Sequence, residues 1–279
     1  MEIWHRVAFD ADTKLNFKKG IDKLGIKYKI TPGLKPNKIG LISFDIAESH
    51  PHWQEVEQLL RKYPSVNMYE TIFSEKESLE ATWCRLMPAF EQGYPQPEST
   101  WPDTHITYEG TCAECGVYAR QKESFRIKKE PHLGRKQFMS LYWTSALLAT
   151  PTVLAEFAAR QLRGYEIWPV LIHKTSQPAE KIAQLYVPNI TRAVMIPEAG
   201  LPRKTCSLCG VTKYEYHKRG YMQFDRALLD TDLDFMMTGE WFGSGHLAFR
   251  EMLVSRRVAQ LIIEHKWQGV SLKPVLPLS

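Results

Sequence analysis

The sequence carries one short phrase twice, as TCAECGV at residues 111–117 and as TCSLCGV at residues 205–211. Five of the seven positions agree, and they include both cysteines of each pair. A Cys-x-x-Cys turn places two sulfurs on one side of a tight loop, and a Gly after the second Cys permits the backbone to turn beneath a metal ion. Each phrase therefore offers half of a tetrahedral metal site.

The two halves together predict a closed structural zinc site. Its ligands are Cys112, Cys115, Cys206 and Cys209. Four thiolates leave no coordination position for water or substrate, so we expect Zn²⁺ in a structural and not a catalytic role. The 90 residues between the second and third of these cysteines far exceed the roughly 15–20 of the common four-cysteine pattern. The site must therefore join two distant parts of the fold.

Two other uses of these cysteines stay open at this point. Paired Cys-x-x-Cys redox motifs follow a strand and open a helix in a βαβ unit. The segments around the two phrases, 106–108, 125–127 and 214–224, are instead typical of hairpin strands. Two disulfides would require an oxidising compartment. The spacing favours zinc over both.

The composition is that of an ordinary soluble globular protein. Of 279 residues, 44% are hydrophobic and 24% are charged, which suits one large domain or two modest ones. No run approaches the roughly 18 apolar residues of a membrane span, and the first residues lack the apolar stretch of a signal peptide. We therefore expect a cytoplasmic protein with no membrane partner. The fifth cysteine, Cys84, is expected to be a small core residue.

Residues 1–92 predict a ferredoxin-like α+β domain. Strands are expected at 4–9, 26–30, 39–46 and 66–73, with helices at 12–24 and 51–63. This order, β-α-β-β-α-β, is the split βαβ pattern. A further helix is expected over 74–90. The prolines within 93–103 mark a domain boundary, so the second domain would span 104–279.

The second domain predicts a duplicated α+β unit joined by the zinc site, with copy one at about 105–172 and copy two at about 193–279. Each copy has a cysteine knuckle, a strand, an aromatic pair, a helix that ends at Gly, and a strand with Pro five residues after that Gly. The matched positions are Tyr142-Trp143 with Trp241-Phe242, Thr150 with Ser255 as helix N-caps, Gly164 with Gly269, and Pro169 with Pro274.

The second copy is eleven residues longer between its knuckle and its helix, and the excess falls near residues 230–246. Loops tolerate change and carry binding sites. We therefore predict that Trp241, Phe242 and His246 belong to a partner-binding surface.

Basic residues follow both knuckles and suggest a second hypothesis, nucleic-acid binding. They are Arg126, Lys128, Lys129, Lys213, Lys218 and Arg219. Because the knuckles should be neighbours, these side chains could form one positive patch that contacts phosphates. The alternative is that they give solubility or offset the thiolate charge. The net charge of +5 is mild and favours that alternative.

The two Cys-x-x-Cys-Gly phrases, followed near the end by a helix and the strand Val270-Ser271-Leu272-Lys273-Pro274, resemble the double-CxxCG motif proteins. These bacterial proteins are linked to polymorphic-toxin immunity. The resemblance begins at about Cys112 and implies a protein partner such as a toxin, without catalysis. No nucleophile, paired carboxylate or open metal site stands out in the sequence, so we expect a non-enzymatic binding protein.

Overall fold

The chain is a mixed α+β protein with two compact units. The computed structural model describes residues 1–32, 40–63, 65–100, 106–118, 120–192, 195–196 and 201–278, except for the side chains of Thr100 and His246. Unit 1 comprises Met1–Ser74 with Lys218–Gly220, and unit 2 comprises Glu75–His217 with Tyr221–Ser279. The predicted α+β class is confirmed. Among the described residues, no helix has the length and apolar character needed to cross a membrane.

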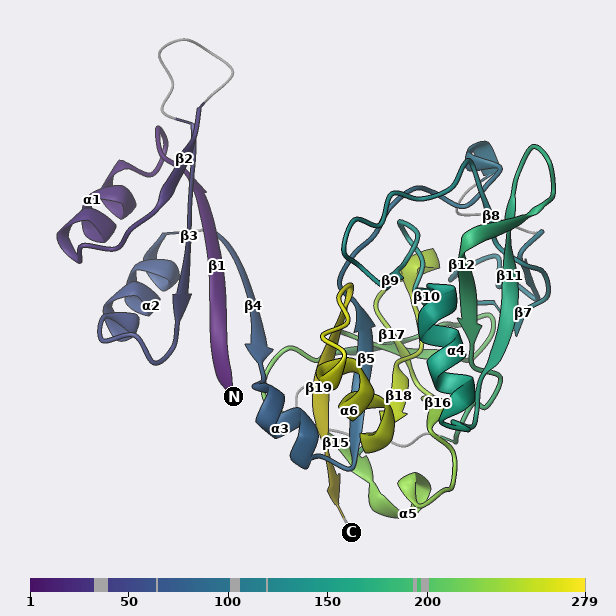
Figure 1. Cartoon of the computed structure of the whole chain (residues 1–279). Coiled ribbons are helices and arrows are strands. Elements are labelled where there is room, and N and C mark those ends of the chain that lie inside the picture. The colour runs from purple at the N-terminus through teal and green to yellow at the C-terminus, as the bar shows by residue number, and fades with distance from the viewer. Residues whose placement is uncertain are drawn as a thin grey trace. The chain divides into compact units, whose positions relative to one another are not determined.

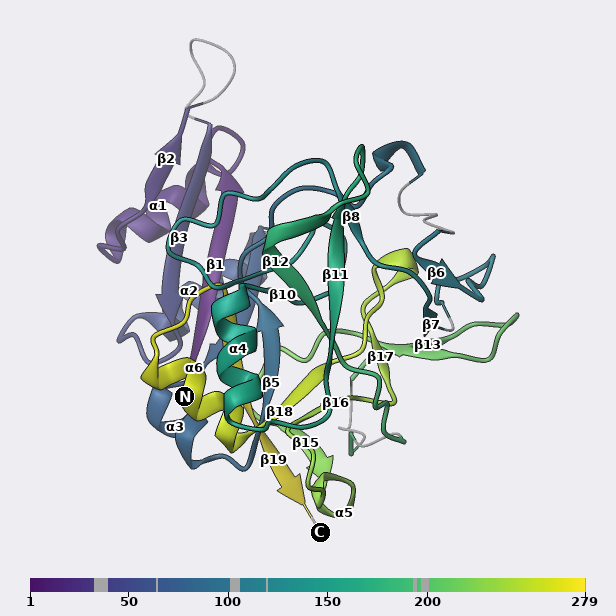
Figure 2. The ribbon, with the colours of Figure 1, turned by 45° about the vertical axis from the view of Figure 1, so that its right-hand side comes forward.

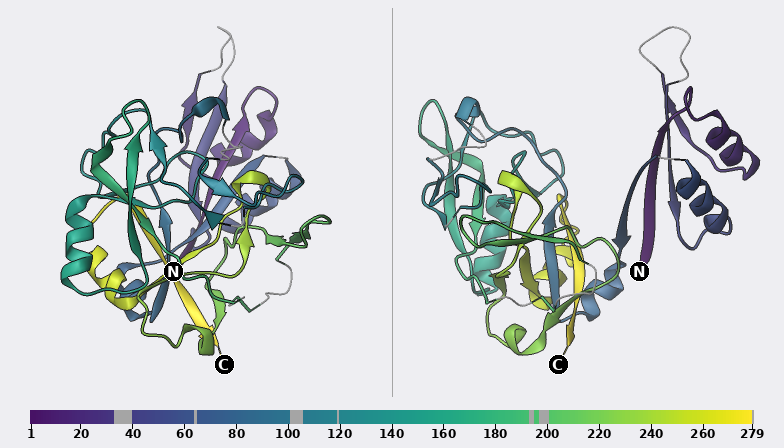
Figure 3. Two further views of the ribbon diagram at one scale, coloured as in Figure 1. Left: turned by 90° about the vertical axis from the view of Figure 1, so that its right-hand side faces the viewer. Right: turned by 180° about the vertical axis from the view of Figure 1, so that it is seen from behind.

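Unit 1 is a four-stranded antiparallel sheet with two helices. Its elements are β1 (Glu2–Asp10), α1 (Leu15–Lys23), β2 (Lys29–Thr31), β3 (Leu41–Ala47), α2 (Trp53–Lys62) and β4 (Val66–Ile72). The strand order is β2-β3-β1-β4. Both helices lie on the same face of the sheet (Figures 1 and 3). Phe17 and Ile21 of α1 and Val56 of α2 pack there against alternate strand residues such as Val7 and Phe44.

The segment Lys218–Gly220 is tied to the edge strand β4. The Thr71 backbone N–H donates to the Lys218 carbonyl at 2.9 Å, and the Gly220 N–H donates to Thr71 Oγ1 at 2.7 Å. Arg219 donates to both carboxylate oxygens of Glu48, which also contacts His5 Nε2 at 2.9 Å. These contacts explain why three residues from the far end of the sequence belong to unit 1.

Unit 2 contains two five-stranded sheets of matching design. The first has the order β8 (Arg126–Ile127), β11 (Glu166–Ile172), β12 (Pro178–Tyr186), β10 (Leu148–Ala149) and β9 (Phe138–Met139). The second has the order β15 (Met222–Asp225), β19 (Val270–Leu278), β5 (Trp83–Pro88), β18 (Met252–Ser255) and β16 (Phe235–Met237). In each sheet the first two strands are parallel and the other neighbours antiparallel.

One helix follows the same strand in each sheet of unit 2. Helix α4 (Pro151–Ala159) follows β10, and α6 (Arg256–Glu264) follows β18. Thr150 and Ser255 are their N-caps, as predicted, with extended backbones at φ −70° and −67°. The two helices lie side by side (Figures 2 and 3). Buried residues of both, including Phe157 and Ile262, share one apolar cluster.

Two glycines bring the sheets into close backbone contact. Gly164 has φ +97°, and a Cβ built on it would lie 2.3 Å from the Phe235 carbonyl oxygen. Gly269 has φ +101°, and a Cβ there would lie 2.0 Å from the Phe138 carbonyl oxygen. Only glycine tolerates both the left-handed φ and this approach. Each glycine thus follows the helix of one sheet and abuts the outer strand of the other.

The expected helix over 74–90 is wrong. The structure has a short helix, α3 (Glu75–Glu80), followed by the strand β5. Trp83, Cys84 and Leu86 are buried in that strand because β18 and β19 flank it on either side. A strand covered on both faces is a continuous apolar run, which periodicity alone does not separate from a buried helix. Residues 75–92 therefore belong to unit 2, and the units divide at Ser74 and not at the predicted 93–103.

The remaining elements of unit 2 are short. They are η1 (Glu98–Thr100), β6 (Tyr108–Glu109), β7 (Arg120–Gln121), β13 (Arg203–Thr205), β14 (Thr212–Tyr214), α5 (Arg226–Leu229), β17 (Trp241–Phe242) and η2 (Gly245–Leu247). Strands β6 and β7 form a hairpin around the first knuckle, and β13 and β14 form one around the second. Strands therefore flank each knuckle, but not all of the predicted segments form them. Residues 126–127 are β8, which pairs with β11 in the first five-stranded sheet, and residues 215–221 are not in a strand.

Candidate metal centre

The two cysteine knuckles fold in the same way. The Cys112 N–H donates to the Val117 carbonyl at 2.8 Å, and the Cys206 N–H donates to the Val211 carbonyl at 2.9 Å. The glycine after each second cysteine donates back to the first cysteine's carbonyl, at 2.8 Å in one knuckle and 3.0 Å in the other. Both glycines have φ +72°. The turn therefore depends on a left-handed residue at this position, as the sequence pattern predicts.

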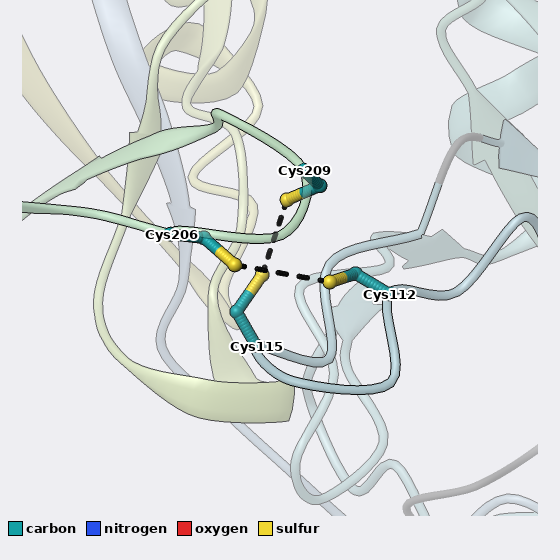
Figure 4. A group of neighbouring side chains, drawn as sticks. All are labelled: Cys112, Cys115, Cys206 and Cys209. Carbon is teal, nitrogen blue, oxygen red and sulfur yellow. Dashed lines mark hydrogen bonds between the residues drawn. The ribbon is translucent and has the colours of Figure 1, made fainter.

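The four sulfurs form one compact group. All four Sγ atoms of Cys112, Cys115, Cys206 and Cys209 lie within 4.8 Å of one another. Figure 4 shows the sulfurs of the two loops pointing toward a common centre. The Cys112–Cys206 separation is 3.9 Å and the Cys115–Cys209 separation is 3.6 Å. A tetrahedral ion with metal–sulfur bonds of about 2.3 Å has an edge of about 3.8 Å, so the donor set fits such an ion.

The thiols of this group differ in acidity. Backbone N–H groups of Cys115 and Glu114 lower the pKa of Cys112 to about 7. The Val211 N–H lowers the pKa of Cys209, but burial and the neighbouring cysteines outweigh it and raise that pKa to about 12. One thiolate thus opposes the ionisation of the next. A bound cation removes this conflict, because a coordinating thiol loses its proton to the metal.

Polar contacts join the two knuckles beyond the sulfurs. The Lys213 ammonium is buried and donates to the Cys115 carbonyl at 2.9 Å. The Ser207 hydroxyl donates to both carboxylate oxygens of Glu114, at 2.8 and 3.0 Å. The repeated phrase does not predict this hydrogen bond, because Glu114 and Ser207 occupy its variable positions. Their pairing as hydrogen-bond donor and acceptor can be recognised only when the two knuckles are known to lie face to face.

The predicted partner-binding aromatics prove to be interior residues, which corrects that prediction. Trp241 is 4% exposed and Phe242 is fully buried. Trp241 packs in the cluster that contains Cys115, Cys206 and Ala248, and Tyr118 approaches its ring edge-on at 5.2 Å. Strand β17 pairs with β14, and its two rings enter different clusters: Trp241 packs with the knuckle cysteines, and Phe242 packs with Phe224 and Leu253. The side chain of His246 lies outside the described residues.

The basic residues of the nucleic-acid hypothesis do not share one element or one environment. Arg126 lies in β8 and donates to Ser176 Oγ at 2.9 Å, with Lys128 and Lys129 exposed beyond that strand. Lys213 is buried under the knuckle. Lys218 and Arg219 belong to unit 1, where the guanidinium binds Glu48. Within unit 2, exposed positive charge from this set therefore comes from the β8 end alone.

No protein-family model matches the sequence, and a search of curated proteins gives no match either.

Proposed function

We propose that the four cysteines bind one structural Zn²⁺ ion that joins two copies of a duplicated unit. The duplication is supported by the common strand order of the two sheets and by equivalent registers at their parallel edges, where Leu171 pairs with Arg126 and Leu276 with Gln223. The contacts of Gly164 and Gly269 support it too, because each glycine touches the outer strand of the other sheet. Zinc is favoured by four thiolate donors at tetrahedral spacing.

In this duplication the first strand of each copy is exchanged. Strand β5 precedes the first knuckle but pairs with β18 and β19, which follow the second knuckle. Strand β12 precedes the second knuckle but pairs with β10 and β11, which follow the first. Arg85 and Gln184 occupy matching positions in these two central strands, opposite Leu253 and Leu148. Because the central strand is exchanged, neither copy could complete its sheet alone.

We also propose that unit 1 is a ferredoxin-like domain. Its support is the order β-α-β-β-α-β together with the all-antiparallel strand sequence β2-β3-β1-β4 and two helices on one face. That arrangement is what two split βαβ units produce when they interleave.

The function we propose is that of a non-enzymatic protein-binding module, immunity-like in the sense of the double-CxxCG resemblance, which binds and neutralises a toxin. One observation carries the non-catalytic part. The four cysteines alone satisfy a tetrahedral ion, so no position is left to activate water or substrate. A cytoplasmic location is proposed with it, since reduced thiolates are needed for metal binding.

The test is rescue of growth. Cells that express individual toxin domains from the source organism are grown with and without this chain. We expect rescue from one toxin, which then co-purifies with the chain as a stoichiometric complex. A matched variant, Cys84→Ser, should rescue as well, because Cys84 lies outside the metal group. Absence of rescue from every toxin tested would contradict the immunity-like proposal.

Nucleic-acid binding is the second candidate, and the same protein sample tests it. Fluorescence anisotropy with labelled DNA and RNA is measured over a range of salt concentrations. Phosphate contacts give affinity that falls steeply with salt, and Lys128→Glu with Lys129→Glu would remove the exposed charge near β8. Salt-sensitive binding that this double variant abolishes would favour the nucleic-acid function.

A further inference from the structure

A pocket of unit 2 lies outside the metal centre and has its own chemical character. It has a volume of about 270 Å³ and is lined by the aromatic rings of Trp143, Tyr216 and Phe249, the carboxylate residue Glu91, and apolar residues that include Met87 and Leu247. Ligand pockets usually begin at roughly 300 Å³. This one therefore suits a small ligand or a single side chain.

Trp143 is held on the surface in a conformation that tryptophan rarely adopts. It is 51% exposed and has φ +62°. The turn around it is fixed, because the Tyr142 N–H donates to the Gly93 carbonyl at 2.9 Å and the Thr144 N–H donates to the Leu141 carbonyl at 3.1 Å. A left-handed backbone is unfavourable for a residue with a Cβ atom. Strain that the surrounding structure maintains is typical of binding sites.

Tyr216 and Phe249 form a second aromatic wall. Their ring centroids are 5.4 Å apart. Gly243 leaves room for the phenol, since a Cβ at that glycine would lie 3.1 Å from the Tyr216 hydroxyl oxygen. Tyr216 is nevertheless 45% exposed. Its ring is thus fixed by packing on one side and open to the pocket on the other.

Glu91 supplies a negative charge with no counter-ion. Backbone bonds fix its position, because the Ser140 N–H donates to the Phe90 carbonyl at 2.8 Å and the Gln92 N–H donates to the Ser140 carbonyl at 3.0 Å. Within the part of the chain that the structure describes, no ion pair or side-chain hydrogen bond reaches its carboxylate. Glu91 is exposed, and partial desolvation of its carboxyl group raises its pKa.

The two other charged residues of the pocket wall are already paired. Glu251 is buried and accepts from the guanidinium of Arg85. The Arg250 guanidinium donates from Nη1 to the Thr238 carbonyl at 2.9 Å and to the Gly239 carbonyl, and lies 4.6 Å from the centre of the Trp241 ring. Of the two carboxylates in the wall, Glu91 is therefore the one without a cationic partner in the described part of the chain, and the Arg250 guanidinium is engaged by the two carbonyls and the Trp241 ring.

We propose that this pocket binds an alkylated ammonium group, held against the rings of Trp143 and Tyr216 and balanced by the carboxylate of Glu91. Aromatic rings attract cations through their quadrupole, and an adjacent carboxylate adds a direct charge interaction. Bulky alkyl groups on the nitrogen also fill the apolar wall. The group can come from a free quaternary ammonium compound or from a modified lysine side chain. This inference does not depend on the metal centre or on the proposed partner.

The experiment compares choline with its neutral isostere 3,3-dimethyl-1-butanol by isothermal titration calorimetry on the whole wild-type protein. We expect choline to bind at least about tenfold more tightly, the difference that a cation–π contact with a carboxylate would supply. Equal affinity for the two compounds would overturn the proposal. This comparison needs no variant and so does not depend on the folding of one.

Variants then assign the residues. Glu91→Gln removes the charge with the same shape, and Trp143→Phe keeps an aromatic ring of weaker quadrupole. We expect each to weaken choline binding about three- to tenfold and Trp143→Ala to abolish it, whereas the exposed control Glu123→Gln leaves it unchanged. Unchanged binding by Glu91→Gln and Trp143→Ala, with wild-type thermal melting, would overturn the assignment.

A peptide that carries trimethyllysine distinguishes the two sources. Tighter binding of the peptide than of choline supports a protein side chain as the natural ligand. Tighter binding of choline supports a free compound. Both results require the same ammonium group to occupy the pocket, as competition between the two ligands would show.

Discussion

The Sγ atom of Cys115 lies 3.6 Å from the Sγ atom of Cys209, although 94 positions of sequence separate the two residues. Each sulfur belongs to a knuckle with the same hydrogen bonds and the same left-handed glycine. Local turns position the sulfurs within each knuckle, but only the packing of unit 2 brings the knuckles together. A metal at this point would close a loop through most of that unit.

The accessibility of the thiols should depend on the metal. Of five cysteines, four form the group and Cys84 is fully buried, with burial raising its pKa to about 12. We expect the native metal-bound protein to react slowly with a thiol reagent such as DTNB. A strong chelator should release the four grouped thiols, and denaturant should release the fifth. Rapid reaction of all four thiols before chelation would contradict metal ligation.

Gly269→Ala should destabilise unit 2 strongly. The new Cβ would lie 2.0 Å from the Phe138 carbonyl oxygen at φ +101°, so both clash and backbone strain apply. We expect a loss of about 3 kcal/mol in urea unfolding followed by circular dichroism. The control is Gly134→Ala, at φ +58° with nothing within 4 Å of the added carbon. It should lose only about 1–2 kcal/mol, and equal losses for the two variants would argue against the close backbone contact.

Removal of one partner from the buried Arg85–Glu251 pair should be costly. Both side chains are almost fully buried, and Arg85 lies in the central strand of the second five-stranded sheet. Glu251→Gln leaves the Arg85 charge without compensation, which typically costs about 3–5 kcal/mol. The exposed pair Arg120–Glu109 provides the control, and Glu109→Gln should change the free energy of unfolding by less than about 1 kcal/mol. Similar effects of the two substitutions would contradict the burial of the first pair.

Stability should fall as the pH decreases from about 6.5 to about 4. Burial, followed by the positive charges of Arg85 and Lys273, lowers the pKa of His217 from 6.5 to about 4. In this window the unfolded chain binds a proton that the folded chain does not. The free energy of unfolding therefore decreases as the pH falls. His217→Gln should flatten the wild-type slope of midpoint against pH over that range. A slope that the substitution leaves unchanged would place the pH dependence elsewhere.

The sequence predicts local chemistry well and strand partners poorly. The repeated phrase is sufficient to predict that Cys112, Cys115, Cys206 and Cys209 come together, because each knuckle is a local structure and four thiolates suit one ion. Helix caps at Thr150 and Ser255 are local for the same reason. The identity of β5 is not local. Its first four residues, Arg85 included, are all buried, so they show no alternation of buried and exposed positions, and only their pairing with β18 and β19 makes them a strand.

The two aromatic pairs illustrate why exposure is hard to predict. Both pairs precede a helix, and the sequence predicts a surface position for Trp241 and Phe242. Those rings are buried in β17, which pairs with β14, whereas Tyr142 and Trp143 are exposed. The segment between β16 and β18 is longer than the one between β9 and β10 and folds back as β17. Residue type and position relative to the helix therefore do not distinguish a buried aromatic ring from an exposed one.

The most direct test of the account is the metal content of the purified chain, measured by inductively coupled plasma mass spectrometry. We predict one zinc per chain in the wild type and in Cys84→Ser, and loss of that zinc in both Cys115→Ser and Cys209→Ser, with a fall in melting temperature. Both knuckles must contribute for either single substitution to release the ion. Absence of metal, or zinc that survives the loss of a cysteine from one knuckle, would contradict a shared site.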